Sequence, residues 1–366
     1  MKTLLVSMAD TQYDGRTRAL IEIIKSFSDL HVISSTKGES FSEPGHDYIG
    51  ISGKNGYARF CRATVEVGSR QEGVDCLFID NRRAVIPGLK LRKKLKPRLT
   101  IYDARELYIR SEMKSLSGKI GCDIEKKMFR TADLVICCNE ERRKIMIELY
   151  GGFIKDIFVF DNFRRLQYSQ DADIETFKIK YKKLFKENVK KIVSTSGSDL
   201  GRNTLEAVIT VSRLSQICSL YLVGCKPGYD TDVIMNYLDQ HNVYNVHVLP
   251  MTVQDELKYI VSNCDIGLAL YGKHDSNNLY CSSGKLYEYI YEGLPIITSD
   301  NPTLTDVTKK YKIGSSSFDL QSSIRDVCEN YDYYKSNVEE LIASDIVNRE
   351  QTHFTEKLRR YIEDHL

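Results

Sequence analysis

Residues 281–300, CSSGKLYEYIYEGLPIITSD, decide the fold of this chain. The segment opens with small residues and continues with a helical pattern whose apolar side chains fall on one face, before it stops at Gly293. An apolar run at 296–298 follows Pro295, and such a run is typical of a buried strand. Because similar strands and helices alternate along the rest of the chain, we expect an α/β fold with parallel sheets.

The small residues that open this helix predict an anion site. A loop at a helix N-terminus offers free backbone N–H groups to an anion, and Lys285 adds a point charge beside them. Glu288 follows one turn later on the same side, where it can accept hydrogen bonds from a vicinal diol such as a ribose. Taken singly, both residues are also typical of a solvated surface. Their order favours a nucleotide-sugar pocket whose donor-binding residues are Ser282, Ser283, Gly284, Lys285 and Glu288.

KLYEYIYEGLPIITSD, at 285–300, resembles the donor-site signature of retaining glycosyltransferases of family four, which have the GT-B fold. In that family the glutamate matching Glu288 holds the ribose, while the lysine and backbone amides hold the diphosphate. The resemblance extends over most of the chain, through TIYDARELYIR at 100–110, RTADLVICCNEERRKIMIELYG at 130–151 and VSTSGSDLGRNTLEAV at 193–208. It implies two Rossmann-like domains that face each other across a cleft, with a C-terminal helix that crosses back to the first domain.

Length and pattern also predict two domains, because 366 residues exceed one domain of ordinary size. A polar, charged stretch at 164–188 separates two α/β series, and we place the boundary near Arg165. We expect an N-terminal acceptor-binding domain at 1–165, completed by a helix at about 350–366, and a nucleotide-sugar donor-binding domain at 166–349. Predicted strands cover 2–8, 30–35, 76–79, 99–103, 134–138, 158–160, 191–194, 220–223, 246–249, 266–270 and 296–298. Predicted helices cover 18–27, 140–149, 175–185, 205–214, 233–240, 254–263 and 354–364.

The chain departs from the family pattern in three places. Many members carry two glutamates eight positions apart, and here Tyr280 stands at the earlier position. The histidine of an Asp-x-His-Glu motif is replaced by Arg105, so either Arg105 or Glu106 takes over part of its role or the motif is structural. Of the basic pair that flanks the diphosphate, Arg202 matches one member and Ser198 stands at the other. The resemblance thus implies Arg202, Lys285, Glu106 and Arg105 as catalytic residues, and adds Ser198 and Tyr280 to the donor-binding residues.

The expected mechanism follows from the charge that must be stabilised. Breaking a sugar–diphosphate bond leaves negative charge on the diphosphate, and a preformed positive field stabilises it best. Arg202, Lys285 and the amides of Ser283 and Gly284 can supply that field. The nearest Asp-x-Asp motif, at 171–173, lies in the polar stretch, so we expect no metal site and metal-independent transfer. In a retaining reaction without an enzymic nucleophile, the departing phosphate would deprotonate the acceptor. We expect no cofactor beyond the co-substrate, a UDP- or GDP-sugar.

Residues 10–17, DTQYDGRT, join the first strand to the first helix. Gly15 would allow a phosphate or ligand to approach closely, and α/β proteins bind ligands at the carboxyl ends of parallel strands. An ordinary turn between strand and helix is the alternative. The candidate acceptor or cleft residues are Asp14, Gly15, Arg16 and Asp103.

Residues 82–98 hold eight basic side chains with no acid between them. One interpretation is a patch that contacts anionic lipid head groups, which would suit a lipid-linked acceptor. The other is a solvated helix face, because Pro87 and Pro97 bound a short stretch that is no long amphipathic anchor.

Composition limits the remaining functions. A formal charge of +2 argues against general attraction to nucleic acid. The ten cysteines include no C-x-x-C pair, so we expect reduced thiols in a cytoplasmic protein, peripheral at the inner membrane face if the basic segment binds lipid. No G-x-G-x-x-G follows the first strand, which argues against a dehydrogenase. We expect sugar transfer to a glycan or lipid-linked acceptor in surface polysaccharide or glycoconjugate synthesis. The alternatives are a nucleotide-sugar 2-epimerase and a non-catalytic nucleotide-sugar-binding protein.

Overall fold

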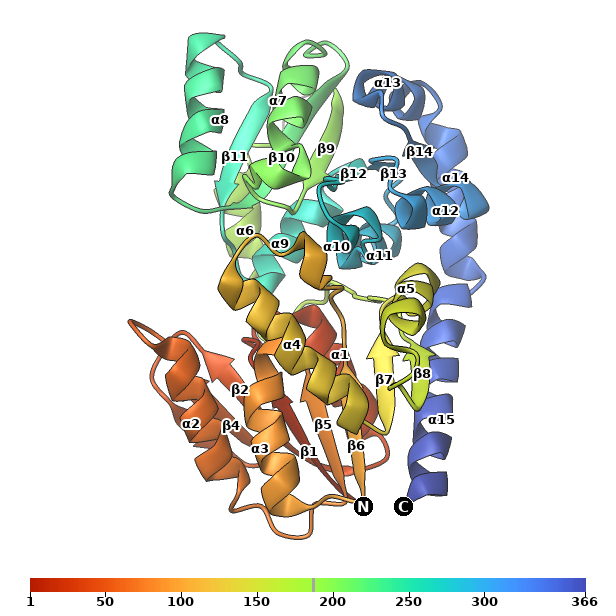
Figure 1. Ribbon diagram of the computed structural model, residues 1–366. Coiled ribbons are helices and arrows are strands. Elements are labelled where there is room, and N and C mark those ends of the chain that lie inside the picture. The colour runs from red at the N-terminus through yellow and green to blue at the C-terminus, as the bar shows by residue number, and fades with distance from the viewer. Residues whose placement is uncertain (186–187) are drawn as a thin grey trace. The chain divides into compact units, whose positions relative to one another are not determined.

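The computed structural model describes residues 1–185 and 188–366, which form two compact units. The first unit comprises Met1–Phe163 and Asn348–Leu366, and the second comprises Arg164–Val347. The second unit is therefore inserted in the sequence between the two segments of the first (Figure 1). The polar stretch at 164–188 includes residues 186 and 187, which lie outside the described residues.

The first unit is built on a sheet of eight strands in the order β3-β4-β2-β1-β5-β6-β7-β8. β3 and β4 are antiparallel, and every other described pair in this sheet is parallel. Buried aliphatic side chains fill its central strands, as expected for a sheet covered on both faces. The strands are β1 Lys2–Ser7, β2 Asp29–Thr36, β3 Phe41–Glu43, β4 His46–Gly50, β5 Cys76–Asp80, β6 Leu99–Asp103, β7 Leu134–Cys137 and β8 Asp156–Val159.

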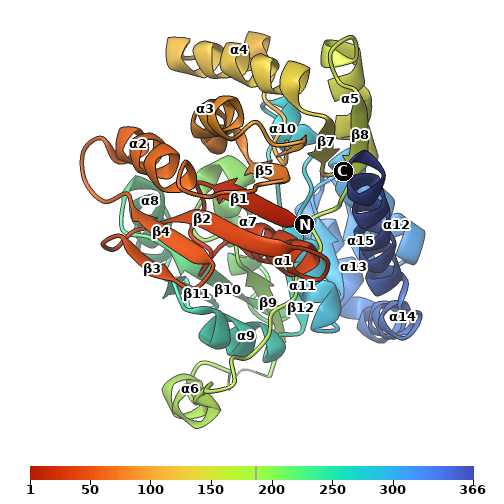
Figure 2. The same cartoon turned by 90° about the horizontal axis from the view of Figure 1, so that it is seen from below.

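Helices cover both faces of this sheet, with α2, α3 and α4 on one side and α1 on the other (Figure 2). The last helix returns from the second unit and packs along the edge strand β8. There Phe354 stacks on Phe160 with ring centroids 4.2 Å apart, and Tyr361 donates a hydrogen bond to the Asp133 carbonyl at 3.0 Å. The helices are α1 Gly15–Lys25, α2 Gly56–Gly68, α3 Val85–Leu95, α4 Leu116–Thr131, α5 Glu140–Tyr150 and α15 Ile346–His365, with short 3-10 turns η1 Arg82–Ala84 and η2 Arg110–Glu112.

The second unit has a sheet of six parallel strands in the order β11-β10-β9-β12-β13-β14. Its strands are β9 Lys190–Ser194, β10 Cys218–Cys225, β11 Val246–Pro250, β12 Ile266–Ala269, β13 Ile296–Thr298 and β14 Gly314–Ser316. Its helical segments are α6 Ile174–Tyr181, η3 Leu200–Arg202, α7 Thr204–Ser212, α8 Tyr229–Gln240, α9 Gln254–Ser262, α10 Ser276–Leu279, α11 Gly284–Tyr291, α12 Pro302–Tyr311, α13 Leu320–Glu329 and α14 Tyr331–Ala343.

The predicted α/β class with parallel sheets is confirmed. Most predicted strands lie within a residue or two of the observed bounds, and the strand at 99–103 is β6 itself. The prediction that the C-terminal helix returns to the first part of the chain is also confirmed, since the described unit that holds β1 also holds most of α15. In α11, Leu286, Tyr289 and Ile290 are buried together, as their spacing predicts.

Three local predictions are corrected. The first helix begins at Gly15 rather than residue 18, because the Asp14 side chain caps it by accepting from the Thr17 amide. Gly15 is therefore the first helical residue and does not shape a turn. Pro87 does not end the basic segment but lies in the first turn of α3, where a backbone N–H has no partner to lose.

Candidate active site

The helix start that residues 281–300 predict is the N-terminus of α11. Ser283 is its N-cap residue, and its side chain caps none of the described helix amides. The Ser283 hydroxyl instead accepts a hydrogen bond from the Tyr271 phenol at 3.2 Å. Tyr271 follows β12, so the loop after one strand of the parallel sheet meets the helix that leads to the next. The Leu286 amide donates to the Ser283 carbonyl at 3.1 Å, so the amides of Gly284 and Lys285 are the first-turn donors left for an anion among the described contacts.

Two cations lie above the ring of Tyr271. The Cζ atom of Arg202, at the end of η3, is 4.7 Å from the ring centroid. The Nζ atom of Lys285, in the first turn of α11, is 6.0 Å from it. The sequence-predicted residues Arg202 and Lys285, which are far apart in the chain, are thus brought to one aromatic platform.

A third cation, Arg164, reaches the same helix start. Its Nε atom is 3.5 Å from Oε1 of Glu288, which is 8% exposed. A Cβ atom built on Gly284 would fall 1.8 Å from the same Nε, so the Arg164 side chain lies directly against the Gly284 backbone. Gly284 thus leaves room for a guanidinium at the first turn of α11.

The crowding of these cations changes the acidity of Lys285. Burial, followed by the charges of Arg202 and Arg164, lowers the pKa of Lys285 to about 7, although Glu288 and Asp199 oppose the shift. An arriving anion would favour the protonated ammonium. Negative charge added beside Lys285 would therefore offset the mutual repulsion of these cations.

The other predicted donor-binding residues occupy separate places in the second unit. Ser198 lies in the loop after β9, and its hydroxyl shares a hydrogen bond of 2.6 Å with the Thr231 hydroxyl. Tyr280 is the C-cap residue that follows α10, just before the small residues that precede α11. Their roles in donor binding stay predictions.

In the first unit, the polar side chains at the carboxyl ends of β1, β5 and β6 form a second cluster. Ser7, Asp80 and Asp103 stand side by side because the register pairs Ser7 with Asp80 and Asp80 with Asp103. Arg16 binds both oxygens of Asp103, at 2.8 and 2.7 Å. Arg105 binds Asp14 at 2.8 and 2.9 Å and Asp80 at 3.0 Å.

Two acids of this cluster, Asp80 and Asp14, have pKa values that are shifted in opposite directions. Burial raises the pKa of Asp80 to about 6, against the opposing charge of Arg105. For Asp14, burial acts in the same direction but is outweighed by Arg105 and the Thr17 amide, which bring its pKa to about 2. Each arginine of the cluster is held by carboxylates.

The predicted residues of the first unit are thus partly brought together. Arg105 joins Asp14 and Asp80 in one network, whereas Arg16 and Asp103 are held by each other inside the core. Glu106 accepts a hydrogen bond from the Tyr108 phenol, whereas no described ion pair joins it to the network. The assignment of these residues to an acceptor or to catalysis stays a prediction.

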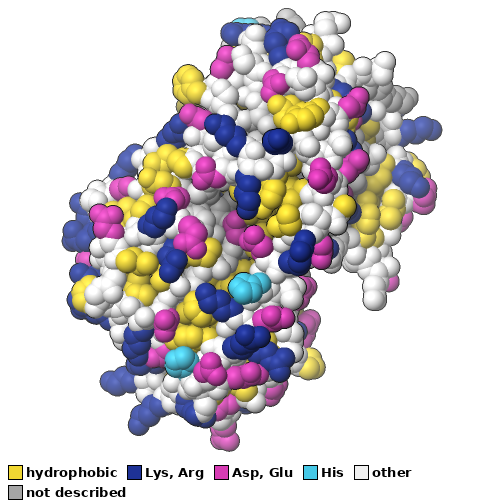
Figure 3. Space-filling model, turned by 90° about the vertical axis from the view of Figure 1, so that its right-hand side faces the viewer, with side chains coloured by type: hydrophobic (Ala, Val, Ile, Leu, Met, Phe, Trp, Pro, Cys, Tyr) yellow, Lys and Arg dark blue, Asp and Glu magenta, His cyan; other side chains and the backbone are white. Residues whose placement is uncertain are grey.

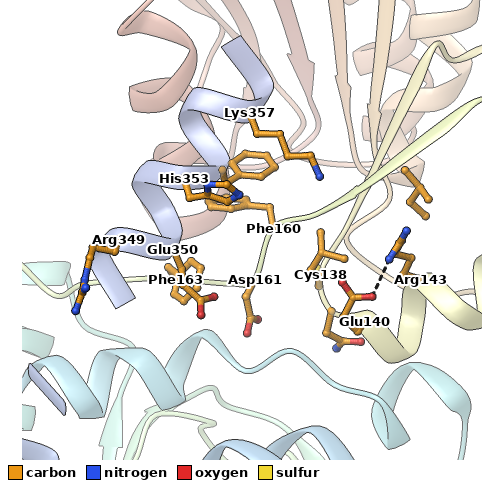
Figure 4. A pocket seen from close by; sticks show the side chains of 14 residues that line it. Cys138, Glu140, Arg143, Phe160, Asp161, Phe163, Arg349, Glu350, His353 and Lys357 are labelled. Atoms are coloured by element: carbon orange, nitrogen blue, oxygen red, sulfur yellow. Dashed lines mark hydrogen bonds and ion pairs between the residues drawn. The ribbon is translucent and has the colours of Figure 1, made fainter. Parts of the chain in front are cut away.

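A cavity of about 660 Å³ lies in the first unit between α5, the end of β8 and α15. In Figure 4, His353, Phe160 and Lys357 lie together on the α15 side, while Glu140 and Arg143 lie on the α5 side. Glu140 and Arg143 form an ion pair of 3.1 Å. On this face of the molecule, basic and acidic side chains alternate with hydrophobic ones (Figure 3). A volume in this range suits a small polar molecule.

Two residues of the second-unit site, Arg164 and Tyr271, were missed by the sequence reasoning. Tyr271 could have been found, since it follows a predicted strand at the edge where parallel sheets bind ligands. Arg164 carries no local signal, because its approach to Gly284 joins positions 120 residues apart. The cavity beside α15 was missed for the same reason, since β8 and α15 are distant in sequence.

In the described ranges 1–185 and 188–366, no group of three or more His, Cys, Asp or Glu side chains is placed to hold a metal ion. A search of the same residues finds no helix with the length and apolar character needed to cross a bilayer. The ten cysteines all lie in the described ranges, none of them forms a disulfide, and nine are buried.

No protein-family model matches this sequence, and no curated protein matches it. Several solved structures, however, have a similar fold. A sucrose-phosphate synthase from Thermosynechococcus elongatus superposes with a TM-score of 0.75 at 13% identity, over 100% of both chains. Anabaena HepE in complex with UDP-glucose gives 0.72 at 13% identity, over 98% of this chain and 99% of its own. WaaG, a glycosyltransferase involved in lipopolysaccharide biosynthesis, gives 0.64 at 13% identity, over 99% of both chains. These neighbours are GT-B glycosyltransferases, and the expected GT-B fold is confirmed.

Proposed function

We propose that this chain is a glycosyltransferase that moves a sugar from a nucleotide-diphosphate sugar to a glycan or lipid-linked acceptor. One observation carries the proposal: Arg164, Arg202 and Lys285 converge at the uncapped start of α11, with Glu288 one turn further on. Cations and helix amides suit a diphosphate, and a carboxylate one turn away suits a ribose. The binding of UDP-glucose by HepE, a structural neighbour, supports a UDP-sugar as the donor.

The second unit would stabilise the leaving group. As the bond between the sugar C1 atom and the diphosphate oxygen breaks, the electron pair stays on that oxygen, and Arg202, Lys285 and the α11 amides stabilise the new charge. The acceptor hydroxyl forms the new bond to C1 and gives its proton to the departing phosphate. We propose retention of configuration, as in family four, and no requirement for a divalent metal.

The first unit would bind the acceptor. Because Arg16 and Asp103 hold each other in the core, Asp14 and Glu106 are the candidates that keep exposed surface toward an acceptor. The mixed charges of the cavity beside α15 would suit a saccharide. Arg105 would act by holding Asp14 in place rather than by replacing the family's histidine as a proton donor, because a guanidinium does not give up its proton.

We also propose that the basic segment contacts anionic lipid. Six of its side chains point to solvent: Arg83, Lys90, Lys93, Lys94, Lys96 and Arg98. Arg82 does not belong to this set, since its guanidinium donates to the Gly118 carbonyl at 2.6 Å and stacks 4.3 Å from the Tyr108 ring. Exposed lysines on a short helix give reversible attraction to a charged membrane surface. Such contact would place the enzyme at the inner membrane face, in surface polysaccharide or glycoconjugate synthesis.

A thermal-shift screen of the whole chain against UDP, GDP and their sugars tests the donor. A ligand that binds only the native state raises its apparent stability by mass action. We expect one nucleoside diphosphate to raise the melting temperature, and its sugar to be consumed only when an acceptor is added. Release of free sugar or an epimer without acceptor would favour the 2-epimerase, and binding without any turnover would favour a non-catalytic binding protein. No shift with any nucleotide would contradict the proposal.

A further inference from the structure

Arg164 is the first residue of the second unit, and its guanidinium lies across the start of α11. A side chain at residue 284 larger than hydrogen would collide with it, since a Cβ atom there would be 1.8 Å from Nε and 2.3 Å from Cζ. The chain therefore places a planar cation where the amides of a helix N-terminus converge. A guanidinium in this position can form two parallel hydrogen bonds to a phosphate, which an ammonium cannot.

The partner that Arg164 has in this structure is a weak one. The 3.5 Å between its Nε and Oε1 of Glu288 is longer than a good N–H···O hydrogen bond. The Nε atom is buried and has no hydrogen-bond partner among the described residues. A buried donor without an acceptor is unfavourable, so an incoming anionic oxygen would satisfy Arg164 better than Glu288 does.

Arg164 lies against the Glu288 carboxylate, which is also the group proposed to bind the ribose. Oε1 of Glu288 lies beside Arg164 in the small space next to Gly284, so moving Arg164 away would make more of the carboxylate's acceptor sites available to a ribose diol. Lys285 and Arg202 flank this space but form no described ion pair with Glu288. A nucleotide that draws Arg164 onto its diphosphate would therefore also leave Glu288 better able to accept from the ribose.

We propose that Arg164 is a third diphosphate-binding cation, which Glu288 holds in reserve until a nucleotide arrives and which then moves onto the diphosphate. The exchange leaves Glu288 free for the ribose, so the two halves of the donor are recognised together. This inference rests on the proposed nucleotide-sugar site of the second unit. The competing explanation is that Arg164 only neutralises Glu288 and never touches the ligand.

Two probes separate these explanations. UDP carries both a diphosphate and a ribose, whereas inorganic pyrophosphate carries only the diphosphate. If Arg164 binds the diphosphate, Arg164→Gln weakens the binding of both probes more than tenfold, and Arg164→Lys restores part of the loss. Glu288→Gln weakens UDP but leaves pyrophosphate unchanged or tighter, because it releases Arg164 and removes a repelling charge.

Calorimetric titration of the full chain measures these affinities, and Arg165→Gln is the matched control. Arg165 is the neighbouring cation, it is exposed, and it stacks 3.7 Å from the Tyr291 ring, so we expect its replacement to change either affinity less than twofold. Circular dichroism of each variant checks that it is folded. The double variant, with both Arg164→Gln and Glu288→Gln, provides a second test of direct contact. In the Glu288→Gln background, Arg164→Gln still weakens pyrophosphate if it contacts the ligand.

The outcomes are distinct. If the wild type binds UDP and Arg164→Gln binds UDP and pyrophosphate equally well, Arg164 is not a ligand and only this inference fails. If Arg164→Gln has an effect that vanishes in the Glu288→Gln background, Arg164 acts as a neutralising residue and the inference is again overturned. If the wild type binds neither UDP, GDP nor pyrophosphate, the proposed donor site fails with it.

Discussion

Each unit carries one cluster of charged side chains beside the carboxyl ends of its central parallel strands, and the two clusters are built in opposite senses. In the first unit, the acids Asp14, Asp80 and Asp103 outnumber the cations Arg16 and Arg105. In the second unit, the cations Arg164, Arg202 and Lys285 outnumber the acids Asp199 and Glu288.

The ion pairs of the first cluster hold its side chains within the fold, whereas we propose that the second cluster receives a ligand. The ion pairs of the first-unit cluster measure 2.7 to 3.0 Å, so both of its arginines are already paired with carboxylates of the same unit. The second-unit pairs of Arg202 and Arg164 are longer, at 3.2 and 3.5 Å. Burial and like charges oppose ionisation in both places, raising the pKa of Asp80 to about 6 and lowering that of Lys285 to about 7. Of these two described clusters, the second is the one in which cations outnumber acids.

The sharpest test of this contrast is to remove one arginine from each cluster. Arg16→Gln leaves the Asp103 carboxylate buried without its partner, and breaking a buried pair costs roughly 3–5 kcal/mol. We expect urea denaturation, followed by circular dichroism, to show a loss of that size. Arg202→Gln is the control, because its pair with Asp199 is partly exposed and should change stability by less than about 1 kcal/mol. Equal losses in the two variants would remove the distinction.

Neutralising Lys93, Lys94 and Lys96 to Gln tests whether lipid contact belongs to the first unit alone. Each near-surface charge is worth about 1 kcal/mol, so vesicle binding should fall on the order of a hundredfold. Co-sedimentation with anionic vesicles at low salt measures it, and high salt should release the wild type as well. UDP affinity should stay the same. If the wild type does not bind vesicles at low salt, the segment is a solvated helix face.

Glu288→Gln tests the ribose contact in the second unit. A hydrogen bond to a charged group contributes roughly 1.5–3 kcal/mol, so UDP affinity should drop more than tenfold. Calorimetry measures the change. Glu339→Gln is a suitable control, since that carboxylate is exposed on α14 and pairs with Lys335 in the same helix. An unchanged affinity in Glu288→Gln would separate Glu288 from the nucleotide.

The pH dependence of binding tests the excess of cations directly. Lys285 carries its charge below its pKa of about 7 and loses it above. We therefore expect UDP affinity to fall several-fold as the pH rises from 7 to about 9, above the second ionisation of the phosphate near pH 6. Lys285→Met should bind more weakly at pH 7 and lack this slope. A wild-type affinity that rises with pH would contradict the assignment.

The smallest expected effect is that of a chelator. If Arg164, Arg202 and Lys285 supply the positive charge, EDTA should leave sugar transfer unchanged within about twofold, since these side chains stabilise the leaving diphosphate themselves. A coupled assay of released UDP measures the rate. Loss of transfer on chelation and its recovery with Mg²⁺ or Mn²⁺ would show that the cations of the second unit are insufficient.

Sequence reasoning reached what depends on local pattern. The strand at 99–103, the face shared by Leu286, Tyr289 and Ile290, and the helix start at Gly284 follow from periodicity and from small residues before a helix. It did not find β3, because a strand of three exposed residues has no alternation to detect. It also did not predict the helices α2, α4, α12, α13 and α14.

In the candidate site, sequence spacing alone grouped Lys285 with Glu288, and Arg202 was included through the family resemblance, whereas contacts between distant segments were missed. Lys285 and Glu288 share one helix turn, so their spacing already implies a common side. Arg164 meets Gly284 only after the chain has folded. The bond between Arg105 and Asp80 also depends on which strands are neighbours, and the order of strands in a sheet is not written in any one segment.

The return of α15 to the first unit has a consequence for synthesis. The ribosome completes every residue of the second unit before it makes 348–366, so the earlier-made unit is the last to be finished. Until then Phe160 lacks the ring of Phe354, and the edge strand β8 lacks the helix that packs beside it. In a nascent chain the edge strand β8 therefore stays uncovered, and able to pair with other chains, while about 180 further residues are translated. A premature stop before residue 348 would leave that edge exposed for good.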